Sequence, residues 1–301
     1  MLSAMRLLVV GASGFLGRNI VQEAVRRGWA VTGTYRMSGD FVRFAKRVGF
    51  SALRYDTLRQ VAPWDSDVCV YLAGNSNHIA SAQDPLADLR NNAEGLLRFL
   101  RSFQGGLVFM SSAAVYEGHR GLVGPATCLR PRLPYAVSKL ACEGYLDYFA
   151  TKGTLEWKTV LRLYYAYGPH DRPTRLIPRL LQAAEWPERE FRITAPRGSL
   201  VDPMYVRDVV DAALAAARGR ARGKTLDLCG GRPQTVPVFV QDAAAAMGLQ
   251  LRIVRVPRAG ESSLRFRSDP RPARRDLGLR VPTSLAEGLR RYRRWRSREG
   301  E

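Results

Sequence analysis

The chain has few of the side chains that bind metals or form disulfides. Its 301 residues include 4 cysteines and 3 histidines, and none of them lies near a second ligand at metal-binding spacing. No two cysteines form a Cys-x-x-Cys pair. We therefore expect reduced thiols and no bound metal ion. These residues are Cys69, Cys128, Cys142, Cys229, His78, His119 and His170.

Long hydrophobic runs are also missing. No apolar segment is long enough to span a bilayer, and the first one, Leu7–Val10, leads directly into glycines with no signal-peptide cleavage pattern. We interpret this segment as a strand and predict a cytoplasmic protein with no membrane partner. Hydrophobic residues make up 46% of the chain and charged residues 25%, which is typical of a globular protein with a substantial core.

Acidic residues and lysine are scarce, whereas arginine is abundant. Lysine and arginine together number 47 against 27 acidic residues, so the formal net charge is +20. The most basic stretch, Arg290–Arg296, is a candidate for nucleic-acid binding. The charge is spread along the chain and no nucleic-acid motif accompanies it, so we favour a solvated terminal helix and no nucleic-acid partner. A cationic surface would also attract a diphosphate substrate or a phosphorylated cofactor.

Short apolar runs alternate with amphipathic stretches in the first half of the chain, as in consecutive βαβ units. Apolar runs of this kind, bounded by turn signals, are typical of strands buried on both faces of a parallel sheet. The predicted strands are Arg6–Val10, Ala30–Tyr35, Ser51–Arg54, Val68–Ala73, Leu107–Ser111 and Thr159–Leu163. The predicted helices between them are Leu16–Arg27, Phe41–Val48, Pro85–Ser102 and Tyr135–Thr151.

The pattern loosens after Pro169. The sequence therefore predicts an α/β protein, with a Rossmann-type doubly wound parallel sheet and a smaller C-terminal substrate-binding lobe. We place the dinucleotide-binding domain at residues 1–165, with residues 203–230 returning to it, and the smaller lobe at residues 166–301. The later predicted elements are a strand at Thr225–Leu228 and helices at Ile177–Ala184, Arg207–Ala217, Val238–Met247 and Ser284–Arg296.

A glycine-rich loop at residues 11–17 follows the first predicted strand and opens the first helix. Gly11 permits a tight turn, Gly14 lets the backbone approach a pyrophosphate, and Gly17 lets helix and strand pack closely. The helix N-terminus adds free N–H groups and a positive dipole end. This loop therefore predicts dinucleotide binding. Its predicted cofactor-binding residues are Gly11, Ser13, Gly14, Phe15, Leu16 and Gly17.

The end of the second predicted strand distinguishes NADP(H) from NAD(H). Proteins that bind NAD usually carry an acid there, which holds the ribose 2′-OH. This chain has Thr34-Tyr35-Arg36 instead. Arg36 could pair with a 2′-phosphate and stack on adenine. We favour NADP(H), and NAD(H) stays open because Arg36 could equally be one more exposed arginine.

Tyr135 and Lys139 form a Tyr-x-x-x-Lys pattern on a predicted helix. Residues four apart lie on one helix face, so the ammonium lies beside the phenol and favours its ionised form. Lys139 can also hydrogen-bond the nicotinamide ribose. Ser112 ends a strand at the carboxyl edge of the sheet, where open α/β folds bind ligands. The pattern predicts that Tyr135 is the general acid/base, Ser112 orients the substrate oxygen, and Lys139 tunes Tyr135.

These motifs together resemble the extended short-chain dehydrogenase/reductase family, and within it the nucleotide-sugar epimerase/dehydratase/reductase group. The resemblance implies that Asp56 contacts adenine and that Ala73, Gly74 and Asn92 lie near the cofactor. It also implies a homodimer in which helices Pro85–Ser102 and Tyr135–Thr151 form a four-helix bundle with their symmetry mates. The matching segments cover nearly the whole chain: 11–17, 70–74, 91–95, 111–116, 135–139, 162–169, 202–209, 275–279 and 282–289.

Three departures from the family pattern bear on the substrate. Dehydrating members carry an Asp-Glu pair where this chain has Ala113-Ala114, so the acid and base for water elimination are missing. The turn that usually presents asparagine to the substrate carries Tyr165. Val201 replaces the arginine that usually grips a substrate phosphate, and Arg197 is near enough to substitute for it. The candidate substrate-binding residues are Ser112, Tyr165 and Arg197.

The leading interpretation is an NAD(P)-dependent oxidoreductase that reduces a 4-keto nucleotide-sugar. The missing acid after the second strand and Arg36 favour a released NADPH donor over the retained NAD of the family's epimerases. A redox-neutral epimerase stays open, because the Ser112–Tyr116 block is equally typical of epimerases. A non-catalytic NAD(P)-sensing module is a more distant alternative, since such a module need not retain Ser112, Tyr135 and Lys139 together.

Overall fold

The computed structural model describes residues 5–37, 39–60, 64–195, 198–256 and 264–299, and a seven-stranded parallel sheet is its centre. The strand order is β3-β2-β1-β4-β5-β7-β12, which reverses direction at β1. This order confirms the predicted α/β fold with a Rossmann-type parallel sheet. The strands are β1 (Arg6–Val10), β2 (Ala30–Tyr35), β3 (Ser51–Arg54), β4 (Val68–Tyr71), β5 (Gly106–Ser112), β7 (Trp157–Leu163) and β12 (Thr225–Leu228).

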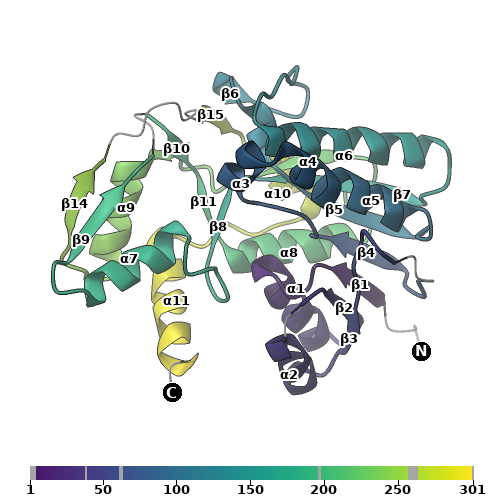
Figure 1. Cartoon of the computed structure of the whole chain (residues 1–301), viewed down its shortest axis with the longest axis horizontal. Coiled ribbons are helices and arrows are strands. Elements are labelled where there is room, and N and C mark those ends of the chain that lie inside the picture. Colours follow the sequence, from purple (N-terminus) through teal and green to yellow (C-terminus); the bar gives the residue numbers. More distant parts are fainter. Residues whose placement is uncertain (1–4, 38, 61–63, 196–197, 257–263, 300–301) are drawn as a thin grey trace.

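Helices cover both faces of this sheet (Figure 1). On one face α1 (Phe15–Arg26) packs against α8 (Val206–Ala217), and on the other α4 (Pro85–Leu89) packs against α6 (Pro134–Thr151). Successive β1 residues therefore enter different cores: Leu7 and Val9 on one side, Leu8 and Val10 on the other. Further helices of the part of the molecule that contains the seven-stranded sheet are α2 (Gly39–Val48), α3 (His78–Gln83), α5 (Gly95–Leu100) and α10 (Arg271–Leu277).

The prediction of one continuous helix over Pro85–Ser102 is wrong. The structure divides it into α4, a π-helical turn at Arg90–Glu94, and α5. Side-chain periodicity barely distinguishes a π-helical turn from an α-helix, whereas such turns are frequent at functional sites. The turn carries Asn92 into the interior, where only 1% of the residue is exposed. Helices α3 and α10 were not predicted, since each is short and has no distinct apolar period.

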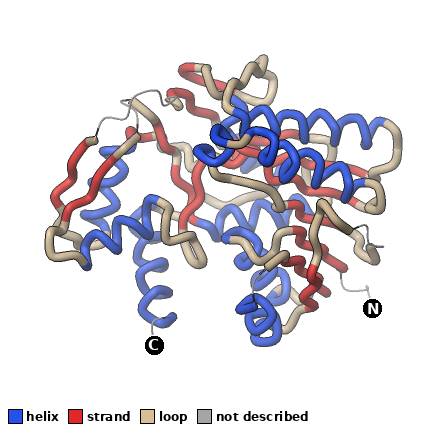
Figure 2. The backbone as a smooth tube through the Cα atoms, viewed as in Figure 1, coloured by secondary structure: helices blue, strands red, loops and turns tan. Residues whose placement is uncertain are grey.

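The C-terminal half contributes a second group of elements, which Figure 2 shows at the left of the molecule. It contains α7 (Leu176–Glu185), α9 (Val236–Ala246) and α11 (Leu285–Glu299), and the parallel pair of β9 (Glu190–Ile193) and β14 (Arg252–Arg255). Three further strand pairs connect distant segments. They are β8 (Tyr165–Tyr167) with β11 (Pro203–Tyr205), β10 (Leu200–Val201) with β13 (Gln234–Thr235), and β6 (Arg120–Val123) with β15 (Arg265–Ser268).

The described residues also locate the groups considered for metals, disulfides and membranes. All four cysteines are free thiols, three of them buried and Cys128 exposed. Within the described ranges no group of histidine, cysteine and acidic residues is placed to hold a metal ion. A search of the same residues finds no helix with the length and apolar character needed to cross a membrane.

Candidate active site

The glycine-rich loop joins β1 to α1 with almost no space around its backbone. Gly11 has a φ of +88°, and a Cβ atom there would lie 2.8 Å from the backbone nitrogen of Ala73. A Cβ atom at Gly17 would lie 2.5 Å from the Cα atom of Ala12. Gly14 precedes the first residue of α1, whose N-terminus has no side-chain cap. The uncapped amides and the bare backbone are suited to a dinucleotide pyrophosphate.

The loop after β4 lies directly against the glycine loop. Gly74 has a φ of +137°, and a Cβ atom there would lie 2.2 Å from Oδ1 of Asn92. That amide oxygen is buried without a hydrogen-bond partner, although Nδ2 of Asn92 donates to Asp88 at 3.0 Å. An orphaned acceptor beside Ala73 and Gly74 is consistent with a bound cofactor. The structure thus brings together the glycine loop and three residues implied by the family resemblance.

Two further candidate cofactor residues lie at the ends of β2 and β3. Arg36 follows β2 directly and is exposed. Asp56 lies two residues after β3, and its Oδ1 accepts the backbone N–H of Leu58 at 3.0 Å. The carboxyl end of β2 therefore carries Arg36 in place of the acid that usually follows the second strand of an NAD site, whereas the end of β3 carries Asp56.

Tyr135 and Lys139 are both buried on α6, with 6% and 5% of each residue exposed. Nζ of Lys139 donates to the carbonyl oxygen of Met110 at 3.1 Å and lies 4.7 Å from the ring centroid of Phe109. These contacts attach the lysine to β5, the strand that ends at Ser112. Because α6 packs against β5, the helix face with Tyr135 and Lys139 lies toward the end of β5 that carries Ser112.

Ser112 ends β5 and begins the short 3₁₀ turn Ala113–Tyr116. Its Oγ accepts the N–H of Ala114 at 3.1 Å, so its own hydroxyl hydrogen is available for another acceptor. Ala113 and Ala114 are buried in this turn, where dehydrating relatives would carry acids. The turn therefore supplies a hydrogen-bond donor at Ser112 and no acidic side chain at positions 113 and 114.

A buried carboxylate that sequence reasoning missed fixes the position of α6. Asp88 accepts hydrogen bonds from Asn75 at 2.8 Å, from Asn92 at 3.0 Å and from Ser138 at 2.7 Å. Ser138 lies between the two catalytic candidates in sequence, so Asp88 links them to the loop after β4 and to the π-helical turn. The sequence signal was an acid on an otherwise apolar helical stretch, which by itself does not identify a partner.

His78, the first residue of α3, is a second missed residue. Its ring centroid lies 4.8 Å from that of Tyr135, with an interplanar angle of 31°. Burial lowers the pKa of His78, and the positive charge of Arg175 lowers it further. The imidazole is therefore neutral at neutral pH, and it packs on one face of the Tyr135 ring.

Behind the candidate catalytic residues, a buried ion pair connects α6 to β7. Arg162 donates to Glu143 at 2.6 Å, and Ser111 donates to the same carboxylate at 2.5 Å. Arg162 also donates to the Tyr116 hydroxyl at 2.7 Å, which in turn donates to Asp227 on β12 at 2.9 Å. Five elements are thereby fixed around the strand end that carries Ser112.

The structure packs Tyr165 inside the C-terminal half. The Arg175 guanidinium carbon lies 4.9 Å from its ring centroid, and the Phe239 ring centroid lies 5.9 Å away. Its hydroxyl is buried without a partner, and burial raises its pKa to about 12. Arg197 lies outside the described residues, and Val201, at the family arginine position, is buried.

A glycine-rich phosphate loop on a doubly wound sheet, with a buried Tyr-Lys pair beside a strand-end serine, defines an NAD(P)-dependent enzyme of the extended short-chain dehydrogenase/reductase type. The sequence profile of the NAD dependent epimerase/dehydratase family matches residues 7–229. The chain belongs to this family.

Individual relatives span nearly the same length. A GDP-6-deoxy-D-mannose reductase of Pseudomonas aeruginosa is 27% identical over 84% of this chain and 83% of its own. A UDP-glucose 4-epimerase of Mycolicibacterium smegmatis is 26% identical over 95% and 96%. Among solved structures, MoeE5 in complex with UDP-glucose and NAD has a TM-score of 0.86 and 28% identity, covering 98% of this chain and 100% of that one. The similarity includes both reductases and epimerases.

Proposed function

We propose that this enzyme uses NADP(H) to reduce the 4-keto group of a nucleotide-activated sugar. The observation that carries the proposal is a complete Ser112, Tyr135 and Lys139 set that lacks the dehydratase acids and lies on a sheet whose β2 is followed by Arg36. The named activity of the P. aeruginosa relative, a reductase of a deoxysugar nucleotide, supports this reaction class. The MoeE5 complex supports a nucleotide-sugar as ligand.

Each catalytic residue has a defined task in this reaction. The nicotinamide, when bound, supplies the hydride that adds to the carbonyl carbon. Tyr135 donates its phenolic proton to the carbonyl oxygen, which becomes the product hydroxyl. Ser112 donates a hydrogen bond to the same oxygen and holds it near the phenol. Lys139, fixed to the Met110 carbonyl, stabilises the phenolate that proton donation leaves behind.

The cofactor preference rests on Arg36. A guanidinium that pairs with a 2′-phosphate contributes about 1.5–3 kcal/mol, which corresponds to roughly 10–150-fold in affinity. We expect NADPH to bind more tightly than NADH by this margin, and Arg36→Ala to remove most of the difference. Fluorescence titration of both cofactors measures it. Arg43→Ala, an exposed arginine on α2, is the matched control. Equal affinities in the unmutated protein would contradict the assignment.

A redox-neutral 4-epimerase is the second candidate, favoured by the M. smegmatis relative and by the NAD held in the MoeE5 complex. Purified enzyme given NADPH and a 4-keto-6-deoxy nucleotide-sugar separates the two. We expect one NADPH consumed for each sugar reduced. Interconversion of 4-hydroxy nucleotide-sugars without added cofactor, by protein that retains NAD through purification, would instead identify an epimerase.

Substrate contacts by Tyr165 and Arg197 remain part of the proposal. Arg197→Ala is expected to raise the KM for the nucleotide-sugar with little change in kcat, because a phosphate contact binds the ground and transition states alike. An unchanged KM would remove Arg197 from the substrate site.

We also propose a homodimer through α4 and α6. The two helices expose apolar side chains on their outer surface: Leu86, Leu89, Val137, Tyr145 and Tyr148, each more than 40% exposed. An apolar surface on two adjacent helices is typical of an isologous helical interface. Light scattering should give twice the chain mass, and a concentration-independent monomer would contradict the proposal.

A further inference from the structure

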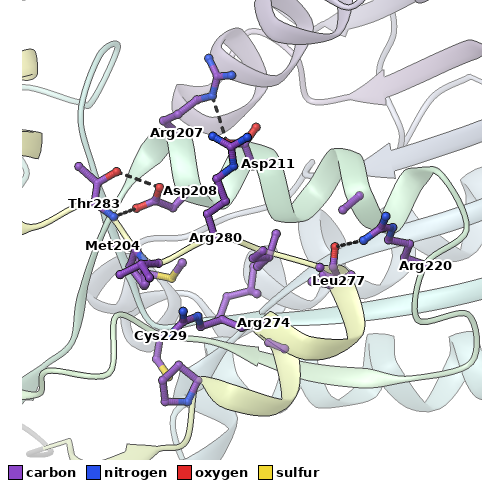
Figure 3. Close-up of a pocket in the computed structure, with 18 of the residues that line it drawn as sticks. Met204, Arg207, Asp208, Asp211, Arg220, Cys229, Arg274, Leu277, Arg280 and Thr283 are labelled. Carbon is purple, nitrogen blue, oxygen red and sulfur yellow. Dashed lines mark hydrogen bonds and ion pairs between the residues drawn. The ribbon is translucent and has the colours of Figure 1, made fainter.

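A cavity lies against α8 and α10, and α8 covers the opposite face of the sheet from α6 (Figure 1). Figure 3 shows side chains that line this cavity. Its volume is about 880 Å³, within the range of small-molecule pockets. None of the candidate catalytic or cofactor residues lines it, so it is separate from the site described above. Seven arginines line it: Arg27, Arg207, Arg218, Arg220, Arg274, Arg280 and Arg291.

Some of these arginines have carboxylate partners. Arg27 and Arg207 both pair with Asp211 and with Glu23, and Arg291 pairs with Glu287. These three guanidiniums each have a carboxylate partner, although Glu23 also pairs with Arg26 and Glu287 also pairs with Arg290.

Four other arginines of the cavity have no carboxylate partner among the described residues. Arg218 lies over the Trp29 ring at 5.3 Å, and Arg220 donates to the Leu277 carbonyl at 3.0 Å. Arg274 has a buried Nε without any hydrogen-bond partner. Arg280 extends from the loop after α10 toward the middle of the cavity, as Figure 3 shows.

The remaining acids of the cavity are already occupied. Asp208 accepts hydrogen bonds from the backbone N–H and the hydroxyl of Thr283, at 2.8 and 2.9 Å. Asp227 accepts hydrogen bonds from Tyr116 and from Ser268. Positive charge in a concave wall raises the local concentration of anions, and a buried donor without a partner costs free energy until a ligand satisfies it.

We propose that this cavity binds a nucleoside di- or triphosphate at a site separate from the cofactor loop. The unpaired arginines come from three segments on different sides of the cavity, namely the end of α8, α10 and the loop after it, which suits an elongated phosphate chain. Guanidinium groups match the geometry of phosphoryl oxygens. Apolar residues of the wall, among them Leu279 and Val281, of which Val281 is 78% exposed, provide a surface for the nucleoside.

Calorimetric titration of the full chain with ADP tests the proposal. Saturating NADPH and NADH are present throughout, so that the glycine loop is occupied whichever cofactor it takes. Pyrophosphate and adenosine are titrated in parallel. We expect ADP to bind most tightly, pyrophosphate more weakly, and adenosine not measurably. This order would identify the phosphate chain as the recognised group and the nucleoside as an added contact.

Two variants and a matched control locate the binding. Arg274→Gln/Arg280→Gln should weaken ADP binding by about a hundredfold or more, since each of the two charge-assisted contacts is worth about a factor of ten or more. Arg280→Gln alone should weaken it in the same direction, and this side chain is exposed, so folding is preserved. Arg101→Gln/Arg130→Gln removes the same charge from exposed positions outside the cavity and should leave ADP binding unchanged.

The nucleotide-sugar site of the proposed function is also expected to bind a nucleoside diphosphate, so the two arginine variants, whose substituted residues lie in the cavity and not among the candidate substrate residues, distinguish the two sites. ADP binding that is unchanged in Arg274→Gln/Arg280→Gln would place the ADP elsewhere and overturn the inference. No ADP binding beyond the cofactor loop would overturn the inference. Equal weakening in the control variant would also overturn it, since the arginines would then act only through net charge. Binding of adenosine as tight as that of ADP would show that the phosphates are not recognised.

Discussion

Replacing Glu143 by leucine would leave the Arg162 guanidinium buried without its carboxylate. The two side chains are only 7% and 5% exposed, and two Arg162 nitrogens, Nη2 and Nε, lie 2.6 and 3.1 Å from the carboxylate oxygens. Breaking a buried pair by removing one partner costs about 3–5 kcal/mol. At about 2 °C per kcal/mol for a chain of this size, the melting temperature of Glu143→Leu should fall by roughly 6–10 °C.

The double variant Glu143→Leu/Arg162→Met tests whether this loss comes from an uncompensated charge. It removes both charges and fills the volume with apolar atoms. Tyr116 keeps its hydrogen bond to Asp227 but loses the one from Arg162, and Ser111 loses its acceptor. Each lost hydrogen bond costs about 1 kcal/mol. We therefore expect the double variant to lose less stability than Glu143→Leu.

The assay is urea unfolding followed by circular dichroism, with the free energy of unfolding compared across the wild type, both single variants and the double variant. Arg162→Met is the second single variant and completes the cycle. If the losses of the two single variants simply add in the double variant, the pair is not energetically coupled and the reasoning fails.

Three further predictions concern the catalytic ring and the pH dependence of stability. Tyr135→Phe should lower kcat by about 10²–10⁴-fold with cofactor affinity unchanged, and near-normal turnover would remove Tyr135 from catalysis. His78→Leu removes the aromatic neighbour of the Tyr135 ring, and an aromatic contact worth about 1.4 kcal/mol corresponds to a tenfold lower kcat. His78→Phe keeps an aromatic ring there and should restore kcat. Equal kcat in the two variants would exclude a packing role. Burial, assisted by the charges of Arg18 and Arg47, lowers the pKa of His170 from its ordinary value of 6.5 to about 4. Between pH 4 and pH 6.5 the unfolded chain therefore binds a proton at His170 that the folded chain does not bind. Stability should therefore fall by about 1–3 kcal/mol as the pH drops from 6.5 to 4, and His170→Asn should flatten that slope in urea unfolding at several pH values.

Much of the fold could be predicted from the sequence because buried parallel strands have a strong local signature. The predicted ranges of β1, β2 and β3 are identical to those in the structure, and the predicted β7 begins two residues too late. The predicted Val68–Ala73 strand was too long, since β4 ends at Tyr71, where the loop that leads to the positive φ of Gly74 begins. Short strand pairs such as β8 with β11 were missed, because segments of three residues carry no measurable period.

Some parts of the candidate site could likewise be predicted from the sequence, and others could not. The glycine loop and the Tyr-x-x-x-Lys helix are local patterns, with spacings that the backbone geometry of a tight turn and an α-helix dictates. By itself the sequence determined these elements and the doubly wound sheet. Only the tertiary structure decided that His78 stacks on Tyr135, that Asp88 accepts from three separate segments, and that seven arginines from distant segments of the chain meet in one cavity. Such contacts depend on the packing of elements far apart in the chain, and no local spacing encodes which side chains will meet.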